Sequence, residues 1–349
     1  MKLGRQLGLL CFVISSVSFF QVSSVSLDGT TGTSIYEAAS YPFANGDFAR
    51  GFVRLNGGFS VPAVSTVSFN VLMPVAGPIN LNSSGKITFE GDLSLASNAT
   101  LVTGGILDGQ GFSFFLNSDF TIPAGQTLAC SSNTVIDGQG HELILAPGSP
   151  GGQIFINGPT GTTLTLRNMI LRGLKEYGSG NRGIKFGPST NQTLILENVE
   201  LHLTGHYVFT GGSLGIQGFT SMYGWNTFEY QANHNCTIQQ DSTLFIDMHT
   251  GFTYNPSDHL KTHLIMTDST SRLFLNGCTL SVPPSTGLSL TIGHLIVDHN
   301  TTFFGYGAAN INEGIIFGNG VLANDLNIDI MPAGNINLNA AFLTYENQS

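Results

Sequence analysis

Short stretches of alternating apolar and polar residues recur along this chain. Leu164 and Leu166 alternate with polar residues, and Leu194 and Leu196 repeat the pattern further along. Alternation of period two over short segments bounded by Gly, Asn and Pro predicts β-strands with one buried face. After residue 26, no stretch long enough for a helix combines a helical period with capping residues. We therefore expect an all-β fold.

The strand segments belong to longer repeats. The sequence ILDGQG at 106–111 returns as VIDGQG at 135–140, and TLTLRN at 163–168 returns as TLILEN at 193–198. Spacings of roughly 20 to 30 residues are typical of one turn of a solenoid. The sequence thus predicts coils that each bury an apolar face against the next coil.

Two further segments continue the repeat. One begins at Thr243 and the other at Arg272, again one solenoid turn apart. The longer gap between Thr193 and Thr243 has room for two shorter coils, and Gly212–Ile216 is the expected start of the second. This division keeps the coil length within the solenoid range.

Identical motifs one coil apart favour a parallel arrangement over an antiparallel sandwich. Stacking places like residues above one another, so we expect Asn168, Asn198 and Asn276 to form a hydrogen-bonded ladder at a coil corner. In the same way we expect the two Asp-Gly-Gln-Gly turns to stack, with Asp108 near Asp137. We interpret these aspartates as turn formers, with a calcium site as the alternative.

The sequence Ile-Asp-Gly-Gln-Gly-His at 136–141, followed by Leu143, Leu145 and Leu-Thr-Leu-Arg-Asn at 164–168, resembles the pectin-lyase-like superfamily. The resemblance covers roughly residues 85–300 and implies a right-handed parallel β-helix. That superfamily includes lyases, hydrolases, phage tailspikes and bacterial surface proteins, so the resemblance implies architecture rather than activity. Its hydrolases carry an Asp-Asp pair, a Gly-His-Gly and an Arg-x-Lys, and none of these is intact here.

Residues 1–26 have the pattern of a cleaved secretory signal. Lys2 and Arg5 precede the uncharged apolar run Leu7–Phe20, and the small residues Ser24 and Ser26 lie where signal peptidase requires them. The run is short for a membrane span, and a retained anchor is the alternative. We expect a secreted or cell-surface protein with no membrane span after cleavage.

The mature chain divides into two regions of different texture. Residues 27–84 are rich in Tyr and Phe among Gly and Pro, with less regular alternation. We interpret them as an N-terminal cap with the first irregular coils, because an open solenoid end exposes a sheet edge. Residues 85–349 are predicted to form the parallel β-helix.

Composition excludes several classes of function. Without Lys2 and Arg5 the chain keeps ten of its twelve basic residues against 22 acidic ones. Nucleic acids and anionic membrane surfaces require basic patches, so neither is an expected partner. Cys130, Cys236 and Cys278 remain after signal cleavage, and we expect them to be buried apolar side chains rather than a disulfide framework.

Half of the mature basic residues lie in one short segment, namely Arg167, Arg172, Lys175, Arg182 and Lys185. One interpretation is a set of solvated charges on loops and coil faces. A second is a surface for sulfated or uronate glycans. The third is lyase chemistry, which requires a basic residue and several carboxylates around calcium, and the acidic complement nearby is small.

Aromatic residues crowd positions 219–230, which include Tyr223 and the single tryptophan, Trp225. Rings on a β-helix face can stack against sugars, because they combine a large apolar area with a polar handle. The alternative is a loop that buries its rings against the flank of a coil.

The histidine spacing does not predict a metal site. His202 and His206, like His259 and His263, have the i, i+4 spacing that places two imidazoles on one helical face. In a strand the same spacing separates them by about 13 Å, too far for one metal ion. No Gly-x-Ser-x-Gly elbow occurs either. We expect no metal, no cofactor and no catalytic residue.

These observations lead to one functional hypothesis and one alternative. The hypothesis is a non-catalytic β-helix with a structural, adhesive or glycan-contacting role, whose partners are glycans or host and cell-surface components. The alternative is a polysaccharide lyase or glycoside hydrolase acting on an acidic polysaccharide. The residues predicted to contact ligand are Tyr223, Trp225, Arg172, Lys175, Arg182 and Lys185.

Overall fold

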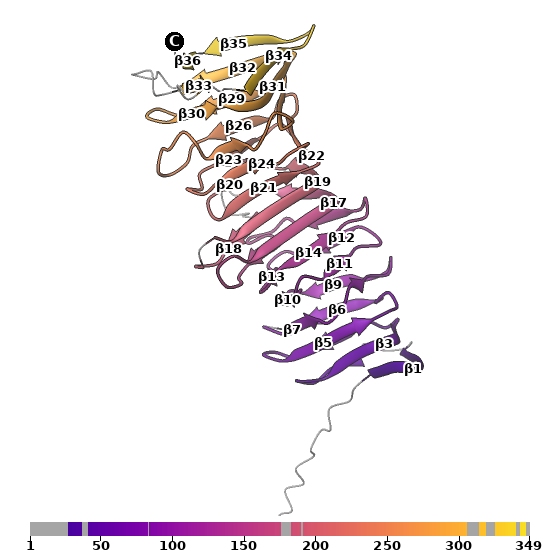
Figure 1. Cartoon of the computed structure of the whole chain (residues 1–349). Helices are drawn as coiled ribbons and strands as arrows, with labels where there is room; N and C mark the ends of the chain where they lie inside the picture. Colours follow the sequence, from indigo (N-terminus) through magenta and orange to yellow (C-terminus); the bar gives the residue numbers. More distant parts are fainter. Residues whose placement is uncertain are drawn as a thin grey trace, which may run out of the picture.

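The chain folds into a parallel β-helix (Figure 1). The computed structural model describes residues 27–36, 41–82, 84–175, 183–189, 191–305, 314–318, 325–339 and 343–346, so the predicted signal segment lies outside it. The described residues contain no helix, and neighbouring coils are joined by parallel strand pairs. The predicted all-β parallel solenoid is confirmed.

The strands form where apolar and polar residues alternate. In β17 (Thr163–Leu174) and β19 (Thr193–Leu203), residues at every second position point into the coil, because successive side chains of a strand face opposite ways. Leu166 and Leu196 lie opposite each other in the pairing, and both are buried in one continuous core. Their predicted inward orientation is confirmed.

Two large sheets run along the solenoid. Sheet 1 contains eight strands: β1 (Leu27–Tyr36), β3 (Phe48–Leu55), β5 (Thr66–Val71), β7 (Lys86–Phe89), β10 (Ile106–Asp108), β13 (Thr127–Cys130), β16 (Gln153–Ile156) and β18 (Gly183–Phe186). Sheet 2 contains fifteen: β8 (Leu93–Ser94), β11 (Ser113–Phe115), β12 (Phe120–Ile122), β14 (Thr134–Asp137), β15 (Glu142–Leu145), β17, β19, β21 (Ser213–Gln217), β22 (Phe219–Tyr223), β24 (Cys236–Ile238), β25 (Thr243–Ile246), β27 (Leu264–Met266), β28 (Arg272–Asn276), β31 (Ile292–Asp298) and β34 (Asp325–Ile330).

Three smaller sheets complete the coils. Sheet 3 contains β2 (Tyr41–Pro42), β4 (Phe59–Val61), β6 (Pro78–Leu81) and β9 (Thr100–Thr103). Sheet 4 contains β20 (Tyr207–Phe209), β23 (Thr227–Tyr230), β26 (Gly251–Tyr254), β29 (Thr279–Val282), β32 (Asn300–Gly305) and β35 (Asn335–Asn339). Sheet 5 contains β30 (Gly287–Leu290), β33 (Gly314–Gly318) and β36 (Leu343–Glu346). Sheet 4 continues the face of sheet 1, because the Tyr207 hydroxyl donates to the carbonyl of Ile184 and accepts its N–H.

The structure tests the predicted stacking of repeats. Thr163 pairs with Thr193, and Thr243 pairs with Arg272, so these repeats do lie one above the other. A coil also begins after Gly212, as expected, since Leu214 pairs with Leu194.

The expected stack of the two Asp-Gly-Gln-Gly turns is wrong. Ile106 pairs with Ala129 in sheet 1, whereas Ile136 pairs with Leu166 in sheet 2. Asp108 therefore ends a strand of one sheet and Asp137 a strand of another. The same local turn, with glutamine in the left-handed region at 110 and 139 (φ 51° in both), serves two different corners.

The asparagine ladder is confirmed at two positions and wrong at the third. Asn198 donates to Asn168 over 3.4 Å, and both have left-handed backbone with φ of 55° and 51°. Asn276 instead continues strand β28 and donates to Asp247 over 3.1 Å. The different length of the intervening coils shifts this asparagine to another corner.

Strand pairing also runs through the predicted cap boundary. β5 pairs with β7 across residue 84, so sheet 1 is continuous from the first coils onward. The function of residues 27–84 as a cap stays a prediction.

The three cysteines of the described region are free and buried, as expected. Burial raises the pKa of the Cys130 thiol to about 12, which leaves it protonated and unreactive at neutral pH. Among the described residues no helix is long and apolar enough to cross a bilayer.

Candidate ligand-binding site

The aromatic segment predicted at 219–230 forms two strands and the corner between them. Phe228 and Tyr230 in β23 are buried, whereas Phe219 in β22 is 50% exposed and Trp225 in the corner is 79% exposed. Burial against a coil, one of the two predicted alternatives, therefore applies to some rings of this segment, and exposure for ligand stacking applies to others. The inward rings fill the coil, and Phe219 and Trp225 face solvent.

Trp225 is held in place by the corner of the next coil. Its ring stacks on the imidazole of His249, with ring centroids 3.9 Å apart and planes 9° apart. His249 lies in the left-handed backbone region with φ of 68°, which histidine tolerates better than most residues. One face of the indole is thus covered by His249, and most of the remaining surface of Trp225 is exposed.

A hollow of about 370 Å³ adjoins this ring pair. It forms because corners of different lengths follow one another between sheets 2 and 4. Four residues join β25 to β26, Gly277 and Cys278 join β28 to β29, His299 alone joins β31 to β32, and four residues again join β34 to β35. Two short corners between two longer ones leave a recess, lined by Met248, His249, Gly277, His299, Asn300 and Ala333. We refer to Trp225 and these six residues as the Trp225 corner.

Gly277 forms the floor of this recess. Its backbone is left-handed with φ of 62°, and an added Cβ would lie 3.2 Å from Cβ of His299. A side chain here would be strained and would fill part of the hollow.

Further rings continue from the corner along the outer face of sheet 2. Phe245 lies between Phe219 and Phe274, with centroid distances of 5.8 Å and 5.0 Å. Tyr223 lies 6.2 Å from Phe245 and 5.3 Å from the imidazole of His202. We call Phe219, Tyr223, Phe245 and Phe274 the aromatic ladder, and its rings lie on three successive paired strands of sheet 2.

The predicted cation Arg172 lies at the end of this surface but is already paired. In the pairing of sheet 2, Arg172 lies opposite His202, which lies opposite Tyr223. Arg172 donates to both oxygens of Glu142, over 2.6 Å and 3.0 Å. Those hydrogen bonds hold the pKa of Glu142 below its ordinary value. The charge of Arg172 is therefore largely compensated within the protein.

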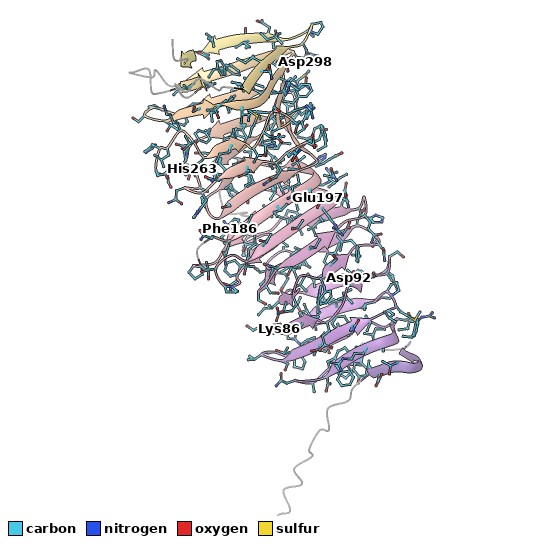
Figure 2. The ribbon with its side chains drawn as sticks, in the orientation of Figure 1. Lys86, Asp92, Phe186, Glu197, His263 and Asp298 are labelled. Carbon is cyan, nitrogen blue, oxygen red and sulfur yellow. The ribbon has the colours of Figure 1, made fainter. Side chains whose placement is uncertain are left out.

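The other predicted cations are divided between faces. The side chain of Lys175 lies over Gly205, where an added Cβ would be 2.5 Å from Cγ of the lysine. This places Lys175 on the same flank as Trp225, since Gly205 precedes that corner by one coil. Lys185 lies in β18 of sheet 1, opposite Phe155. Figure 2 shows its neighbour Phe186 on one flank and Glu197 of sheet 2 on the other. Arg182 lies outside the described residues.

The two histidines of the first predicted pair, His202 and His206, contact different partners. His202 contacts Glu200 at 3.3 Å and Arg172 at 3.3 Å, and His206 contacts Glu229 at 2.8 Å. Across the ranges that the structure describes, no group of three or more His, Cys, Asp or Glu could hold a metal ion.

His249, Gly277 and His299 were missed by the sequence reasoning. Each is a corner residue with positive φ, and no short motif marks them. The available signal was the left-handed preference of Gly and, more weakly, of His, but it does not tell which corners adjoin.

No family model matches the sequence, and no curated protein matches it. The chain is similar to the solved structure of the TibC-catalyzed hyper-glycosylated TibA55-350 fragment. The likeness has 12% sequence identity and a TM-score of 0.32, and it covers 91% of this chain and 97% of that chain. Because the TM-score is so low, this likeness supports no conclusion about the function of this chain. Membership of the pectin-lyase-like superfamily stays a prediction.

Proposed function

We propose that this protein is an exported, non-catalytic β-helix that contacts glycans through the Trp225 corner and the adjoining aromatic ladder. The observation that carries the proposal is the exposed indole of Trp225, which stacks on His249, and His249 in turn lines a hollow. Export rests on the signal-like pattern of residues 1–26, and the fold assignment to the pectin-lyase-like superfamily rests on the motifs at 136–168.

The geometry supports sugar stacking rather than a structural role for Trp225. A ring that stabilises a coil is usually buried, whereas this one keeps most of its surface in water. Its orientation is fixed by the stack on His249, so a sugar ring binding to the open side loses little side-chain entropy from the protein. Tyr223 and Phe219 extend the same surface along β22. Lys175 supplies a cation on this flank for carboxylate or sulfate groups.

An array of neutral, uronate and sulfated oligosaccharides, applied to the mature chain, tests the proposal. Trp225→Ala is expected to lower affinity for the bound uronate and sulfated members at least about tenfold, which corresponds to about 1.4 kcal/mol. Phe52→Ala is the matched control, since Phe52 is a 51% exposed ring on β3, far along the solenoid. Equal binding of the uronate and sulfated members by wild type and Trp225→Ala contradicts the proposed site.

A second candidate function is a lyase acting on acidic polysaccharide. The observation in its favour is the group formed by Arg172, His202 and Glu200, in which His202 lies between the guanidinium and a carboxylate. His202 and Tyr223 are in ring contact, so a base and a phenol adjoin. Against it, the guanidinium is engaged by Glu142, and the hollow at the Trp225 corner contains no carboxylate among its described lining residues.

The two candidates are separated by following ultraviolet absorbance while the mature protein is incubated with polyuronates. The proposal predicts no unsaturated product from the wild type. Product that disappears in His202→Ala, with Phe52→Ala unaffected, establishes the lyase instead.

A further inference from the structure

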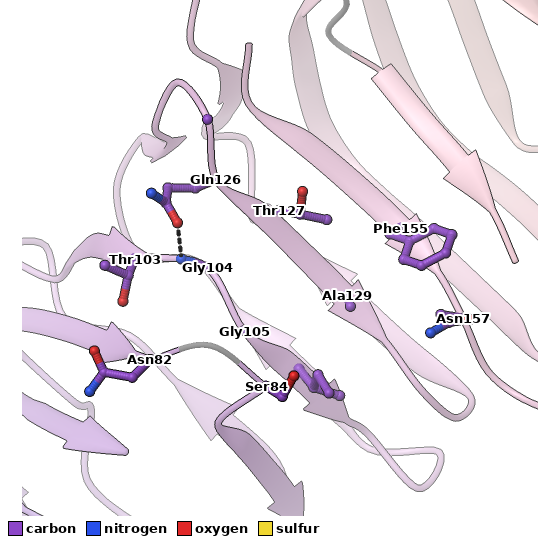
Figure 3. Close-up of a pocket in the computed structure, with 12 residues that line it drawn as sticks. Asn82, Ser84, Thr103, Gly104, Gly105, Gln126, Thr127, Ala129, Phe155 and Asn157 are labelled. Carbon is purple, nitrogen blue, oxygen red and sulfur yellow. Dashed lines mark hydrogen bonds between the residues drawn. The ribbon is translucent and has the colours of Figure 1, made fainter. Parts of the chain in front are cut away.

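A second hollow lies several coils nearer the N-terminal end of the solenoid, where sheet 3 meets sheet 1. Gly104 and Gly105 form the whole connection between β9 and β10. The connections before and after are longer, with four residues between β6 and β7 and four between β12 and β13. The short corner between two longer ones leaves an open hollow of about 470 Å³ (Figure 3). We call it the Gly104 notch, and its lining includes Gly104, Gly105, Gln126, Thr127, Ala129 and Phe155.

The two glycines are required for the notch to exist. A Cβ on Gly104 would lie 2.2 Å from the carbonyl oxygen of Thr127. A Cβ on Gly105 would lie 2.4 Å from Cβ of Leu81. Real Cβ atoms do not approach so closely, so any side chain here would push the coils apart. Backbone without side chains therefore forms part of the notch wall.

The polar groups around the notch are oriented by the protein. The Gln126 side chain accepts a hydrogen bond from the N–H of Gly104 over 2.9 Å. Its NH₂ group consequently points away from Gly104, as Figure 3 shows. The amides of Asn82 and Asn157 and the hydroxyl of Thr127 lie around the same opening. The notch thus offers both hydrogen-bond donors and acceptors.

The notch contains no ionisable side chain among its described lining residues. Lys86 lies opposite Ile106 in the neighbouring strand, but its ammonium donates to Asp108 over 3.1 Å. Burial works against the charge of Asp108, yet hydrogen bonds from Ser132, Gln110 and Lys86 prevail and lower its pKa. This ion pair remains satisfied within the protein, so a charged ligand would gain little from it.

Apolar atoms lie between these polar groups. Ile106, Ala129 and Phe155 follow one another across three paired strands, with the Phe155 ring rising at one side of the notch. A surface that combines neutral amides and hydroxyls with one ring matches a saccharide, whose rings have C–H faces and hydroxyl edges. A peptide could not bind by strand addition, because β7, β10, β13 and β16 each have a strand on both sides.

From this geometry we propose that the Gly104 notch binds an uncharged oligosaccharide, at a site separate from the Trp225 corner. The two hollows lie on different sheets and share no residue. Because the notch uses neutral groups, its ligand binds with an affinity that hardly depends on salt. The protein then holds two glycan sites of different chemistry along one solenoid.

Calorimetric titration of the mature protein tests this, with cellohexaose, mannohexaose and chitohexaose as neutral probes and hexagalacturonate as the acidic one. Ala129→Arg places a long side chain on the notch floor, and Thr165→Arg is its control on the outer face of sheet 2. Phe155→Ala removes the ring, and Phe52→Ala, which removes an exposed ring on β3, is the control. Thermal melting of each variant verifies that it is folded.

We expect at least one neutral hexasaccharide to bind the wild type. Its affinity should change less than about twofold between low salt and about 1 M NaCl, where the Debye length is about 3 Å. Both notch variants should weaken it at least about tenfold, while both controls and Trp225→Ala leave it unchanged. The inference is overturned if no neutral probe binds, or if binding survives Ala129→Arg and Phe155→Ala. Loss of neutral binding in Trp225→Ala alone supports the Trp225 corner and removes the second site.

Discussion

The Gly104 notch and the Trp225 corner arise in the same way but contain different chemistry. In each, short corners with one or two residues lie between corners of four residues, so the surface is recessed where the chain turns early. The notch is lined by amides, hydroxyls and one phenylalanine. The Trp225 corner is lined by two histidines and a methionine, beside a stacked tryptophan.

This difference shows how a solenoid separates architecture from recognition. Inward residues are fixed by packing against the coils above and below, so they must alternate. Corner length is free to vary as long as the strands on each side keep their pairing. A change of two residues in one corner therefore creates a recess without disturbing the core, and the flanking side chains decide what the recess can bind.

The largest expected effect is unfolding of the coils, which would destroy both hollows together. Leu166→Asp places a carboxylate in the continuous core, where Leu166 is 0% exposed. Burying an unpaired charge costs several kcal/mol, and neighbouring coils lose their packing surface. We expect a cooperative loss of β-structure by circular dichroism at temperatures where the wild type is folded. Thr165→Asp, which projects outward from the same strand, is the control. Wild-type melting of Leu166→Asp contradicts the assigned register.

A smaller effect separates the two recesses through their glycines. Gly104→Ala should lower the free energy of unfolding by about 3 kcal/mol, because the clash is with backbone that cannot move aside. Gly277→Ala should cost about 1–2 kcal/mol, mainly from its left-handed φ of 62°.

Gly215→Ala is the control for both glycines. Its added Cβ would lie 3.4 Å from Cγ1 of Ile195, which is an ordinary contact distance. We therefore expect the free energy of unfolding to change by no more than about 0.5 kcal/mol. Denaturant unfolding of the three variants measures how their losses of stability rank. If Gly104→Ala lowers the free energy of unfolding no more than Gly215→Ala does, the close approach of Gly104 to the backbone of Thr127 is wrong.

The ion pair at the end of the aromatic ladder has a smaller effect that depends on pH. The pKa of Glu142 is lowered by Arg172, so the pair stabilises the folded state above the ordinary glutamate pKa of about 4.5 and loses this contribution as pH falls through the lowered value. Both side chains are partly exposed, at 40% and 25%, so we expect about 1 kcal/mol or less at pH 7.

Denaturant titrations of wild type and Arg172→Ala from pH 7 down to about pH 2 check this sign. Their free energies of unfolding should converge in acid. Glu142→Gln serves as a control, because its difference from Arg172→Ala should not vary with pH over this range. A gap between wild type and Arg172→Ala that widens in acid contradicts the account.

The smallest effect on stability is expected for Trp225→Ala. The side chain is 79% exposed and contacts mainly His249, so the free energy of unfolding should change by about 0.5 kcal/mol or less. Unfolding curves of this variant and of Phe52→Ala should both match the wild type. A loss of several kcal/mol means that Trp225 is structural and removes the premise of the proposed site.

Strand identity was predictable, because burial imposes a period of two that is visible at Leu164 and Leu166. Which strands lie above one another was only partly predictable. Coil length varies, so the repeated ILDGQG and VIDGQG turns fall at different corners. A repeat in sequence shows a repeat in local structure, and register requires the length of every intervening corner.

The candidate site was predictable from composition but not from geometry. Trp225 could be found because a lone tryptophan lies among other rings, but its partner His249 lies in the corner of the next coil, at no recognisable spacing. The cations that cluster in the sequence are separated in the fold, since Arg172 is paired with Glu142 and Lys185 lies on another sheet, and their contact with a ligand stays a prediction. The hollows depend on small differences in length between corners, which are within the uncertainty of strand ends read from sequence.

The most direct test uses the single tryptophan as a reporter. Intrinsic fluorescence of the mature protein is recorded while oligosaccharides bound by the wild type are titrated in. Because Trp225 stacks on His249, which lines only one of the two hollows, we predict that glycans whose binding is lost in Trp225→Ala change the emission with saturation. Neutral glycans whose binding is lost in Ala129→Arg should leave it unchanged. Saturable binding of every active glycan with no change in tryptophan emission would contradict the account.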